Sequence, residues 1–322
     1  TSVCYFNILT TFLLLIVYNL SGEIMKVIKI QPQGFCKGVQ RALVIVKDAL
    51  KDDKVAKPLY ILGLIVHNKR LAESLAELGV ISLNEPSKTR LELLNLVKGG
   101  TVILTAHGVS PAVIKTLKER NIPYIDATCP DVDYVHQEIK RYLPTHKILY
   151  LGQKNHPETE GVLGISNNIT LISSLKEAKA YRHQTEKPLF LFNQTTLDVG
   201  FLNSLTQELQ KNYSLSTDNN ICKATLRRQK AVIETAKSEL LIVVGDRLSS
   251  NSNKLVEVAK NKGLNSYLIE TVEDLKIESL LNIKTVSVTS GASTPKAITA
   301  EVIEFLTNFD ANDHKTWENK SN

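Results

Sequence analysis

The chain has 322 residues, of which 43% are hydrophobic and 22% are charged, and its formal net charge is +6. A chain of this length is expected to form two or three domains with substantial cores. The Lys and Arg residues are spread over many segments without a block of like charges, which gives nucleic-acid binding no support. A mild basic excess suits an anionic small substrate or an acidic protein partner instead.

Residues 1–24 are predicted to lie outside the fold. Their apolar stretch, residues 9–20, is shorter than the roughly 20 residues that span a bilayer. No Lys or Arg precedes Lys26, so the basic region of a signal peptide is missing. We expect Met25, the single methionine, to be the native start. A signal anchor or the remnant of a targeting segment is the alternative.

From residue 26 onward, short apolar runs alternate with amphipathic segments. The runs VIKI, VILT, KILYLG, PLFLF, LLIVVG and VSVTS are typical of buried strands. The amphipathic segments predict helices at 39–50, 111–119, 131–142, 198–211, 227–237, 252–262 and 295–306. This alternation indicates parallel sheets covered by helices, in which loops at the carboxyl ends of the strands form the ligand crevice.

Three of the four cysteines are evenly spaced. Cys36 and Cys129 are 93 residues apart, and Cys222 follows after another 93. An odd number cannot pair completely as disulfides, and nothing resembles a small secreted scaffold. Each cysteine precedes a predicted helix, whose dipole stabilises a thiolate by about 0.3–1 kcal/mol. Thiolates are the form that binds metal, although three buried, unreactive thiols are the plainer alternative.

Two polar clusters repeat in phase with these cysteines. The first lies 31, 27 and 27 residues after them, around His67, His156 and residues 249–251. The second lies 71, 66 and 71 residues after them, around His107, Thr195 and Ser293. These repeats predict an α/β fold of three pseudo-symmetric lobes, a trefoil around a common centre.

The repeats also predict the division of the chain. We expect lobes at 25–128, 129–218 and 219–308, and the first strand can join the third lobe instead of the first. The polar residues 309–322 are expected to form a disordered tail.

Thiolates from three lobes predict a metal centre with an open position. Structural zinc sites are usually closed by four ligands from short CxxC-type pairs, and neither feature is present. A four-iron cluster on three cysteines leaves one iron without a protein ligand. The pattern of Cys36, Cys129 and Cys222 therefore favours an iron–sulfur cluster.

Nine segments resemble the 4-hydroxy-3-methylbut-2-enyl diphosphate reductase family, which acts last in the non-mevalonate isoprenoid pathway. They are GFCKGVQRA, IVHNKRL, TAHGVSP, DATCP, NHPETEG, NQTTL, ICKAT, SSNSNKL and TSGAST, in the family's order. The resemblance implies one [4Fe–4S] cluster per subunit, on Cys36, Cys129 and Cys222. It implies reductive removal of an allylic hydroxyl, giving isopentenyl and dimethylallyl diphosphates. Ferredoxin or flavodoxin would donate the electrons. We expect a cytoplasmic protein without membrane association, or a plastid-type location if residues 1–24 are a truncated targeting segment.

The resemblance also implies roles for individual residues. Glu158 matches the family's proton donor, and a carboxylic acid is suited to protonating a departing hydroxyl. Thr195 matches a residue that orients the hydroxyl and the proton relay. Matches to the substrate-binding positions are His67, His107, His156, Thr195, Ser249, Ser250, Asn251 and Ser293. Spacing alone does not separate Glu158 from Glu160, and the SSNSN run also fits an ordinary N-cap cluster.

Some features stand outside this scheme. His136, His146, His183 and His314 fall out of phase and are assigned no role. The chain departs from the family pattern at Asn155, at Leu226 and Arg227, and at residues 246–248. Two other interpretations stay open. One is a quinolinate-synthase-like dehydratase, against which the AHGVS, HPETEG and SSNSN runs argue. The other is a non-catalytic scaffold with reduced thiols, or a zinc protein.

Overall fold

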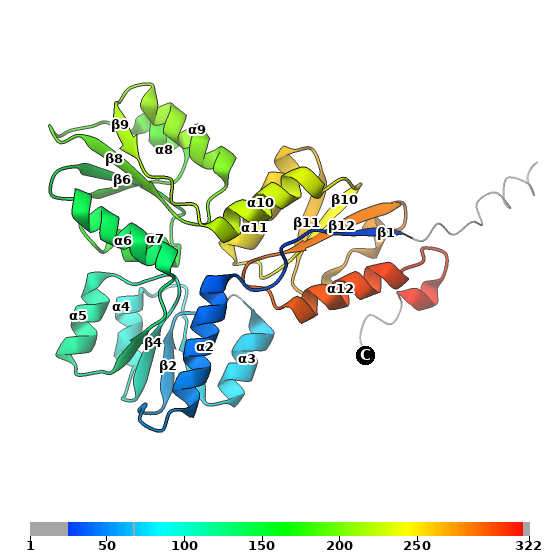
Figure 1. Ribbon diagram of the computed structural model, residues 1–322, viewed down its shortest axis with the longest axis horizontal. Helices are drawn as coiled ribbons and strands as arrows, with labels where there is room; N and C mark the ends of the chain where they lie inside the picture. Colours follow the sequence, from blue (N-terminus) through cyan, green and yellow to red (C-terminus); the bar gives the residue numbers. More distant parts are fainter. Residues whose placement is uncertain (1–24, 67, 318–322) are drawn as a thin grey trace, which may run out of the picture.

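Three four-stranded sheets, all parallel, radiate from a common centre in this computed structural model (Figure 1). The structure describes residues 25–66 and 68–317. We call the sheets and their helices lobes 1, 2 and 3. Lobe 1 has the order β3-β2-β4-β5, lobe 2 the order β7-β6-β8-β9, and lobe 3 the order β1-β12-β10-β11. The α/β prediction with three lobes is confirmed.

The strands are short and mostly buried. Those of lobe 1 are β2 (Leu59–Leu62), β3 (Val80–Leu83), β4 (Thr101–Leu104) and β5 (Tyr124–Asp126). Those of lobe 2 are β6 (Lys147–Leu151), β7 (Ile169–Ile172), β8 (Leu189–Asn193) and β9 (Leu215–Thr217). Those of lobe 3 are β10 (Leu240–Val244), β11 (Asn265–Ile269), β12 (Thr285–Ser290) and β1 (Lys26–Lys29).

Strand β1 holds the place in lobe 3 that β5 and β9 hold in the other lobes. It pairs in parallel with β12, as β5 pairs with β4 and β9 with β8. In each lobe this edge strand is the last before a cysteine, so β1 leads to Cys36. The first described strand, β1, is therefore the edge strand of lobe 3. The other strands of that sheet, β10 to β12, begin only at Leu240.

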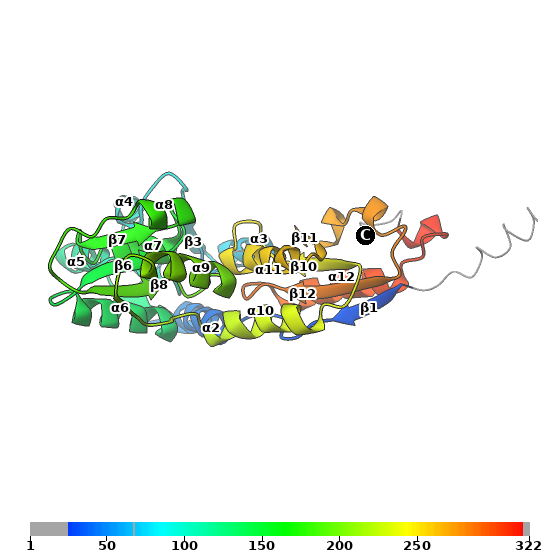
Figure 2. The same cartoon turned by 90° about the horizontal axis from the view of Figure 1, so that it is seen from above.

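Helices cover both faces of each sheet. They are α2 (Lys37–Lys51), α3 (Lys69–Glu77), α4 (Arg90–Leu93), α5 (Pro111–Glu119), α6 (Pro130–Tyr142), α7 (Pro157–Leu163), α8 (Leu175–Ala180), α9 (Val199–Gln210), α10 (Lys223–Thr235), α11 (Ser250–Asn261) and α12 (Lys296–Asn308). Figure 2 shows α2, α6 and α10, the helices that follow the three cysteines, along one side of the molecule.

Each sheet has an apolar cluster on both faces, which explains its continuous apolar strands. In lobe 1, Ile61 and Ile103 belong to one cluster, whereas Leu62 and Leu104 belong to the other. Full burial of such a side chain contributes about 1.5–3 kcal/mol. The lobes thus form their own cores and leave the loops at their inner ends free to build a site.

Of the expected tail, the structure describes residues 309–317, whose two aromatic side chains pack on lobe 3. Residues 318–322 lie outside the described residues. Phe309 is buried in the lobe 3 core, and Trp317 is partly buried against it. Aromatic side chains bury 150–250 Å² each, which offsets the cost of ordering the chain around them. Across residues 25–66 and 68–317, no helix has the length and apolar character to cross a membrane.

Candidate iron–sulfur and substrate site

The three cysteines occupy equivalent positions in the three-lobed fold. Cys36, Cys129 and Cys222 are the N-cap residues of α2, α6 and α10. Each cysteine N–H donates a hydrogen bond of 2.9–3.0 Å to a carbonyl in the loop after β12, β4 or β8. The pairs are Cys36 to Ala292, Cys129 to Ala106, and Cys222 to Thr195. The loops that carry the second polar cluster of the sequence therefore also hold the cysteines.

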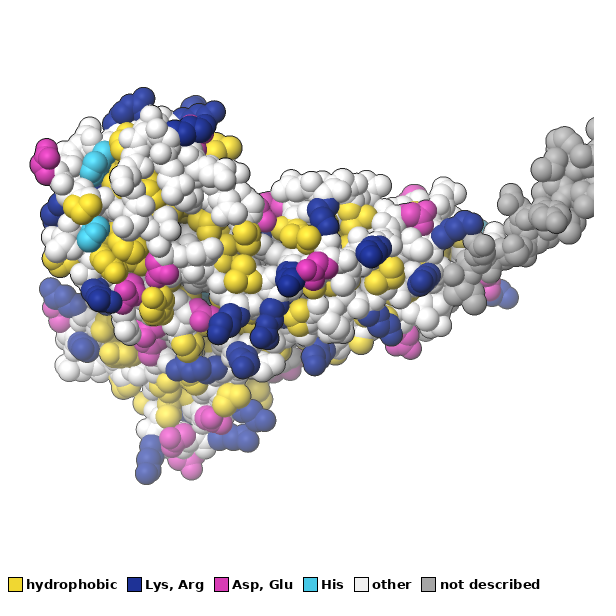
Figure 3. Space-filling view, turned by 45° about the horizontal axis from the view of Figure 1, so that its top comes forward, with side chains coloured by type: hydrophobic (Ala, Val, Ile, Leu, Met, Phe, Trp, Pro, Cys, Tyr) yellow, Lys and Arg dark blue, Asp and Glu magenta, His cyan; other side chains and the backbone are white. Residues whose placement is uncertain are grey.

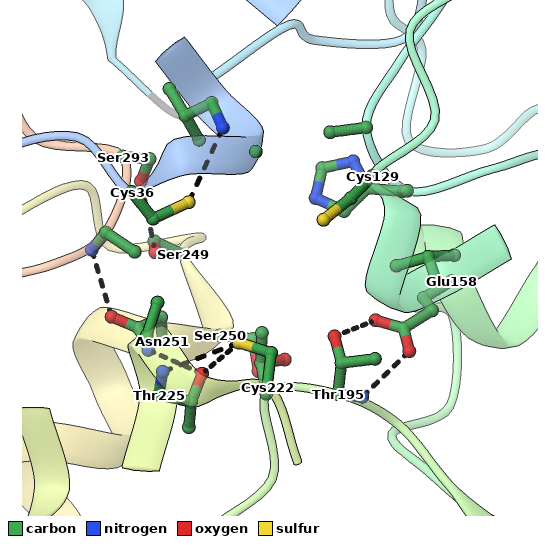
Figure 4. Close-up of a pocket in the computed structure, with 18 of the residues that line it drawn as sticks. Cys36, Cys129, Glu158, Thr195, Cys222, Thr225, Ser249, Ser250, Asn251 and Ser293 are labelled. Atoms are coloured by element: carbon green, nitrogen blue, oxygen red, sulfur yellow. Dashed lines mark hydrogen bonds between the residues drawn. The ribbon is translucent and has the colours of Figure 1, made fainter. Parts of the chain in front are cut away.

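These loops enclose a cavity of about 100 Å³ where the lobes meet (Figure 4). It is lined by all three cysteines and by the predicted residues His107, His156, Glu158, Thr195, Ser249, Ser250, Asn251 and Ser293. His67 lies outside the described residues. Every other predicted site residue lines this one cavity.

Glu158 is the buried acid of the cavity. It is 1% exposed on α7, and its Oε1 accepts hydrogen bonds from the backbone N–H of Thr195 at 2.8 Å and from the Tyr150 hydroxyl at 3.3 Å. Its Oε2 accepts from Thr195 Oγ1 at 3.0 Å (Figure 4). Burial raises the pKa of Glu158 to about 7, and the bonds from Thr195 and Tyr150 oppose that rise. The carboxyl group can therefore hold or release a proton near neutral pH.

Glu160 has a different role from Glu158. Its carboxylate accepts the backbone N–H of Arg90 at 2.7 Å and pairs with the Arg90 guanidinium at 2.9 Å. Arg90 begins α4 in lobe 1, so this ion pair joins lobe 1 to α7 of lobe 2. Two acids two residues apart thus face opposite sides, one toward the cavity and one toward a neighbouring lobe.

The SSNSN run provides the polar groups of lobe 3. Ser249 is the N-cap of α11, and its hydroxyl accepts from the backbone N–H of Ser252. Asn251 bridges two elements, because its amide donates to Thr225 Oγ1 at 3.2 Å and its Oδ1 accepts from Ala292 N at 2.9 Å. Ser293 Oγ donates to Ser249 Oγ at 3.4 Å. The run is both a helix cap and part of the cavity wall, so the two interpretations from sequence do not exclude each other.

Two histidines form the opposite polar part of the wall. His107 and His156 stack edge to face with ring centroids 5.6 Å apart. His156 is the N-cap of α7, and its Nδ1 accepts from the backbone N–H of Glu158 at 3.2 Å. That bond assigns the ring proton of neutral His156 to Nε2.

The three cysteines are only partly buried, yet the protein groups around two of them do not favour the thiolate. Burial raises the pKa of Cys129 to about 11, while the backbone N–H of Asp131 lowers it. Burial also raises the pKa of Cys222, against hydrogen bonds from Thr225 that lower it. The helix N-termini that were expected to favour thiolates are therefore outweighed by burial at these two positions.

Sequence reasoning missed three residues beside the cavity. Tyr150 contacts Glu158 from within β6, Thr225 contacts both Cys222 and Asn251, and Arg228 lies buried behind the cysteines. Tyr150 is hidden in the apolar strand KILYL, where a tyrosine is expected to be core. Thr225 and Arg228 have one sequence signal. They follow Cys222 by about one and two helical turns, so they lie on the same face of α10 as the cysteine.

The departures from the family pattern have local explanations. Asn155 has φ of +59°, a left-handed conformation that glycine and asparagine adopt most readily. Leu226 and Arg227 are exposed on α10. Arg247 forms ion pairs with Glu270 and Asp274 within lobe 3. None of these substitutions removes a residue from the cavity wall.

Residues 27–307 match the sequence profile of the family described as LytB protein. The chain belongs to the LytB family. LytB relatives described as 4-hydroxy-3-methylbut-2-enyl diphosphate reductase include one from Bacillus velezensis, 44% identical over 299 residues, which covers 91% of this chain and 94% of the relative. One from Bacillus cytotoxicus is 42% identical over 303 residues, with 92% and 95% covered. The resemblance stated from the nine segments is confirmed.

Two solved LytB structures are also similar. The E-1-hydroxy-2-methyl-but-2-enyl-4-diphosphate reductase from Plasmodium falciparum is 33% identical, with a TM-score of 0.81 over 88% of each chain. A structure of (E)-4-hydroxy-3-methyl-but-2-enyl diphosphate reductase, described as the terminal enzyme of the non-mevalonate pathway, is 30% identical. It covers 87% of this chain and 98% of its own, with a TM-score of 0.58. The three-lobed fold is therefore that of the LytB family.

Proposed function

We propose that the chain reduces (E)-4-hydroxy-3-methylbut-2-enyl diphosphate to isopentenyl and dimethylallyl diphosphates, using a [4Fe–4S] cluster on Cys36, Cys129 and Cys222. The observation that carries the proposal is a buried carboxylic acid, Glu158, in the same cavity as three cysteines from the meeting point of three lobes. A binding protein or a scaffold would have no use for an acid with a pKa of about 7 beside reduced thiols.

The donor set fits an iron–sulfur cluster better than a single metal ion. All three cysteines are free and line the same cavity. In the part of the chain that the structure describes, no group of three His, Cys, Asp or Glu side chains is placed to hold one ion. Thiolates of a cluster bind different irons and need not converge on one point. When bound, the cluster supplies the electrons and a Lewis-acidic iron, and its positive charge would deprotonate the thiols.

The reaction needs two electrons and two protons for each carbon–oxygen bond that breaks. The hydroxyl leaves as water, and the allylic carbon skeleton takes the electrons and the second proton. Glu158 is placed to donate a proton from Oε2, because Oε1 already accepts two hydrogen bonds. When Oε2 is protonated, its O–H donates to Thr195 Oγ1, and the Thr195 hydroxyl, which lines the cavity, can pass its own proton to the substrate hydroxyl.

The rest of the cavity suits an allylic diphosphate. Val39, Val66 and Val132 line it and offer an apolar surface to the methylbutenyl group. The N-terminus of α11, with Ser249 and its neighbours Ser250 and Asn251, offers backbone and side-chain donors to a phosphate. His107 and His156 line the same cavity and can add donors or positive charge.

A small acidic protein such as ferredoxin or flavodoxin is the proposed electron donor. The three cysteines also line a second depression, formed by the N-terminal ends of α2, α6 and α10. Its rim carries Lys37, Arg41, Lys223 and Arg227, all exposed. Figure 3 shows Lys and Arg side chains gathered near the centre of this part of the surface. Such a rim would steer an acidic carrier to the side of the cysteines away from Glu158.

Reduced cysteines also bear on the compartment. Cytoplasmic thiol systems keep cysteines reduced, whereas secreted proteins tend to form disulfides. We therefore propose a cytoplasmic location, with a plastid-type organelle as the alternative.

The first experiment is anaerobic purification followed by a visible spectrum near 400 nm. We expect a brown wild-type protein, and a loss of colour in each of Cys36→Ser, Cys129→Ser and Cys222→Ser. We then expect wild type to reduce the allylic diphosphate when supplied with a chemical one-electron donor. Glu158→Gln should keep the colour and lose about 10²–10⁴-fold in kcat, since it lacks the acid.

Each alternative predicts a different result. A wild-type protein that stays colourless after reconstitution with iron and sulfide would exclude the cluster and the reductase together. Bound zinc in a colourless protein would favour the zinc interpretation. A brown protein that acts on a dicarboxylate but not on the diphosphate would favour the quinolinate-synthase-like dehydratase.

A further inference from the structure

Arg228 is a buried cation without a carboxylate partner in the parts of the chain that the structure describes. It is 3% exposed on α10. Its guanidinium donates to two backbone carbonyls, Gly34 O at 2.5 Å and Ala224 O at 3.4 Å, and its Nε has no hydrogen-bond partner. By contrast, the other deeply buried arginine, Arg90, is paired with Glu160. Backbone carbonyls are neutral, so they do not balance the charge of Arg228.

The guanidinium stays protonated in proteins, so burial does not remove its charge. A buried charge is strongly destabilising unless another charge compensates it. Cys36 and Cys222 line the same depression as Arg228. As ligands of a cluster they would be thiolates, so the compensating negative charge near Arg228 can come from them.

The position of Arg228 ties it to two of the three cysteines. It lies six residues after Cys222 on the same helix, and its Gly34 contact lies two residues before Cys36. Gly34 has φ of +81°, a conformation that few other residues tolerate, and its N–H donates to Ser290 Oγ. Arg228 therefore joins the loop before α2 to α10, and with both cysteines it lines the depression behind the cavity.

We propose that Arg228 is the buried counter-charge of the cysteine-bound cluster and makes that cluster easier to reduce. The inference rests on the proposed function, since it needs a cluster on Cys36 and Cys222. Each electron that enters adds negative charge to the thiolate-bound group. A fixed positive charge nearby stabilises the reduced form more than the oxidised form, and burial protects that interaction from screening by salt.

The test is an anaerobic redox titration of the purified holoenzyme, followed by visible absorbance and electron paramagnetic resonance. Arg228→Gln should reduce the equilibrium constant for one-electron reduction by roughly tenfold, a midpoint potential about 59 mV more negative. Arg228→Lys keeps the charge and should restore most of this loss. The matched control is Lys230→Gln, which removes an exposed charge from the same helix outside this depression and should leave the potential unchanged.

An Arg228→Gln protein with the wild-type spectrum and the wild-type potential would overturn the inference and leave the proposed function intact. A wild-type protein without a cluster would instead overturn the proposed function. If Arg228→Gln folds by circular dichroism and does not retain iron, the iron and sulfide content of Arg228→Lys decides. Restored loading supports the counter-charge, whereas equal loss shows that charge is not what Arg228 supplies.

Discussion

Burial and hydrogen bonding have opposite effects on the pKa of Glu158. Burial raises its pKa to about 7, and three hydrogen bonds from Thr195 and Tyr150 hold it below the value that burial alone would produce. A proton donor must be protonated before it acts. If Glu158 donates the proton, kcat therefore falls as the pH rises through about 7.

Removal of the Tyr150 hydrogen bond should shift this dependence. Tyr150→Phe takes away a bond that favours the carboxylate, so the pKa of Glu158 rises and the alkaline limb of kcat moves to higher pH. The measurement is the pH profile of single-turnover reduction with a chemical electron donor. Glu158→Gln is the control and should lack that limb. An unchanged limb in Tyr150→Phe would contradict the assignment of Glu158 as the titrating group.

At the scale of elements, helix α7 carries the acid and is packed closely against lobe 1. Gly164, its C-cap, has an ordinary φ of −72° but no room for a side chain. A Cβ there would lie 2.3 Å from Ser110 Cβ, an atom fixed directly to the backbone of lobe 1. Glycine is therefore needed for the close approach of two lobes, not for its backbone freedom.

We expect Gly164→Ala to destabilise the protein by about 1–3 kcal/mol, the usual cost of overpacking. The free energy of unfolding from urea titration measures it. Gly164→Ala combined with Ser110→Gly removes the Cβ and Oγ of Ser110 that the new methyl group would meet, and should recover part of the loss. If the double variant is no more stable than Gly164→Ala alone, the contact with Ser110 is not the cause.

At the scale of the whole molecule, the lobes are joined by ion pairs of unequal burial. Arg90 of lobe 1 pairs with Glu160 of lobe 2, with side chains 7% and 32% exposed. Arg70 of lobe 1 pairs with Glu301 of lobe 3, with side chains 52% and 46% exposed. Removal of one partner from a buried pair leaves an uncompensated charge, whereas exposed pairs contribute little.

Glu160→Gln should therefore destabilise the protein by on the order of 2–3 kcal/mol, below the 3–5 kcal/mol of fully buried pairs because Glu160 keeps some contact with water. Glu301→Gln is the matched control and should cost less than about 1 kcal/mol. Urea unfolding of both variants gives the comparison. Equal losses would show that the lobe 1–lobe 2 joint does not depend on this buried pair.

Much of the architecture could be predicted because it depends on local or periodic features of the sequence. Continuous apolar runs predicted strands buried on both faces, and the equal spacing of Cys36, Cys129 and Cys222 predicted three units. Each cysteine is indeed an N-cap. The roles of the individual site residues stay predictions, although the structure brings all the described ones to one cavity.

The rest depends on contacts between residues far apart in the chain, which no local pattern reports. The sequence by itself determined the three-lobed α/β class, the cysteine set and the polar loops, because these follow from periodicity and spacing. Spacing alone did not separate Glu158 from Glu160, and only the tertiary structure shows that Glu160 pairs with Arg90, 70 residues away. Only it placed Arg228 beside Gly34, 194 residues away, because burial and charge compensation arise when the lobes meet.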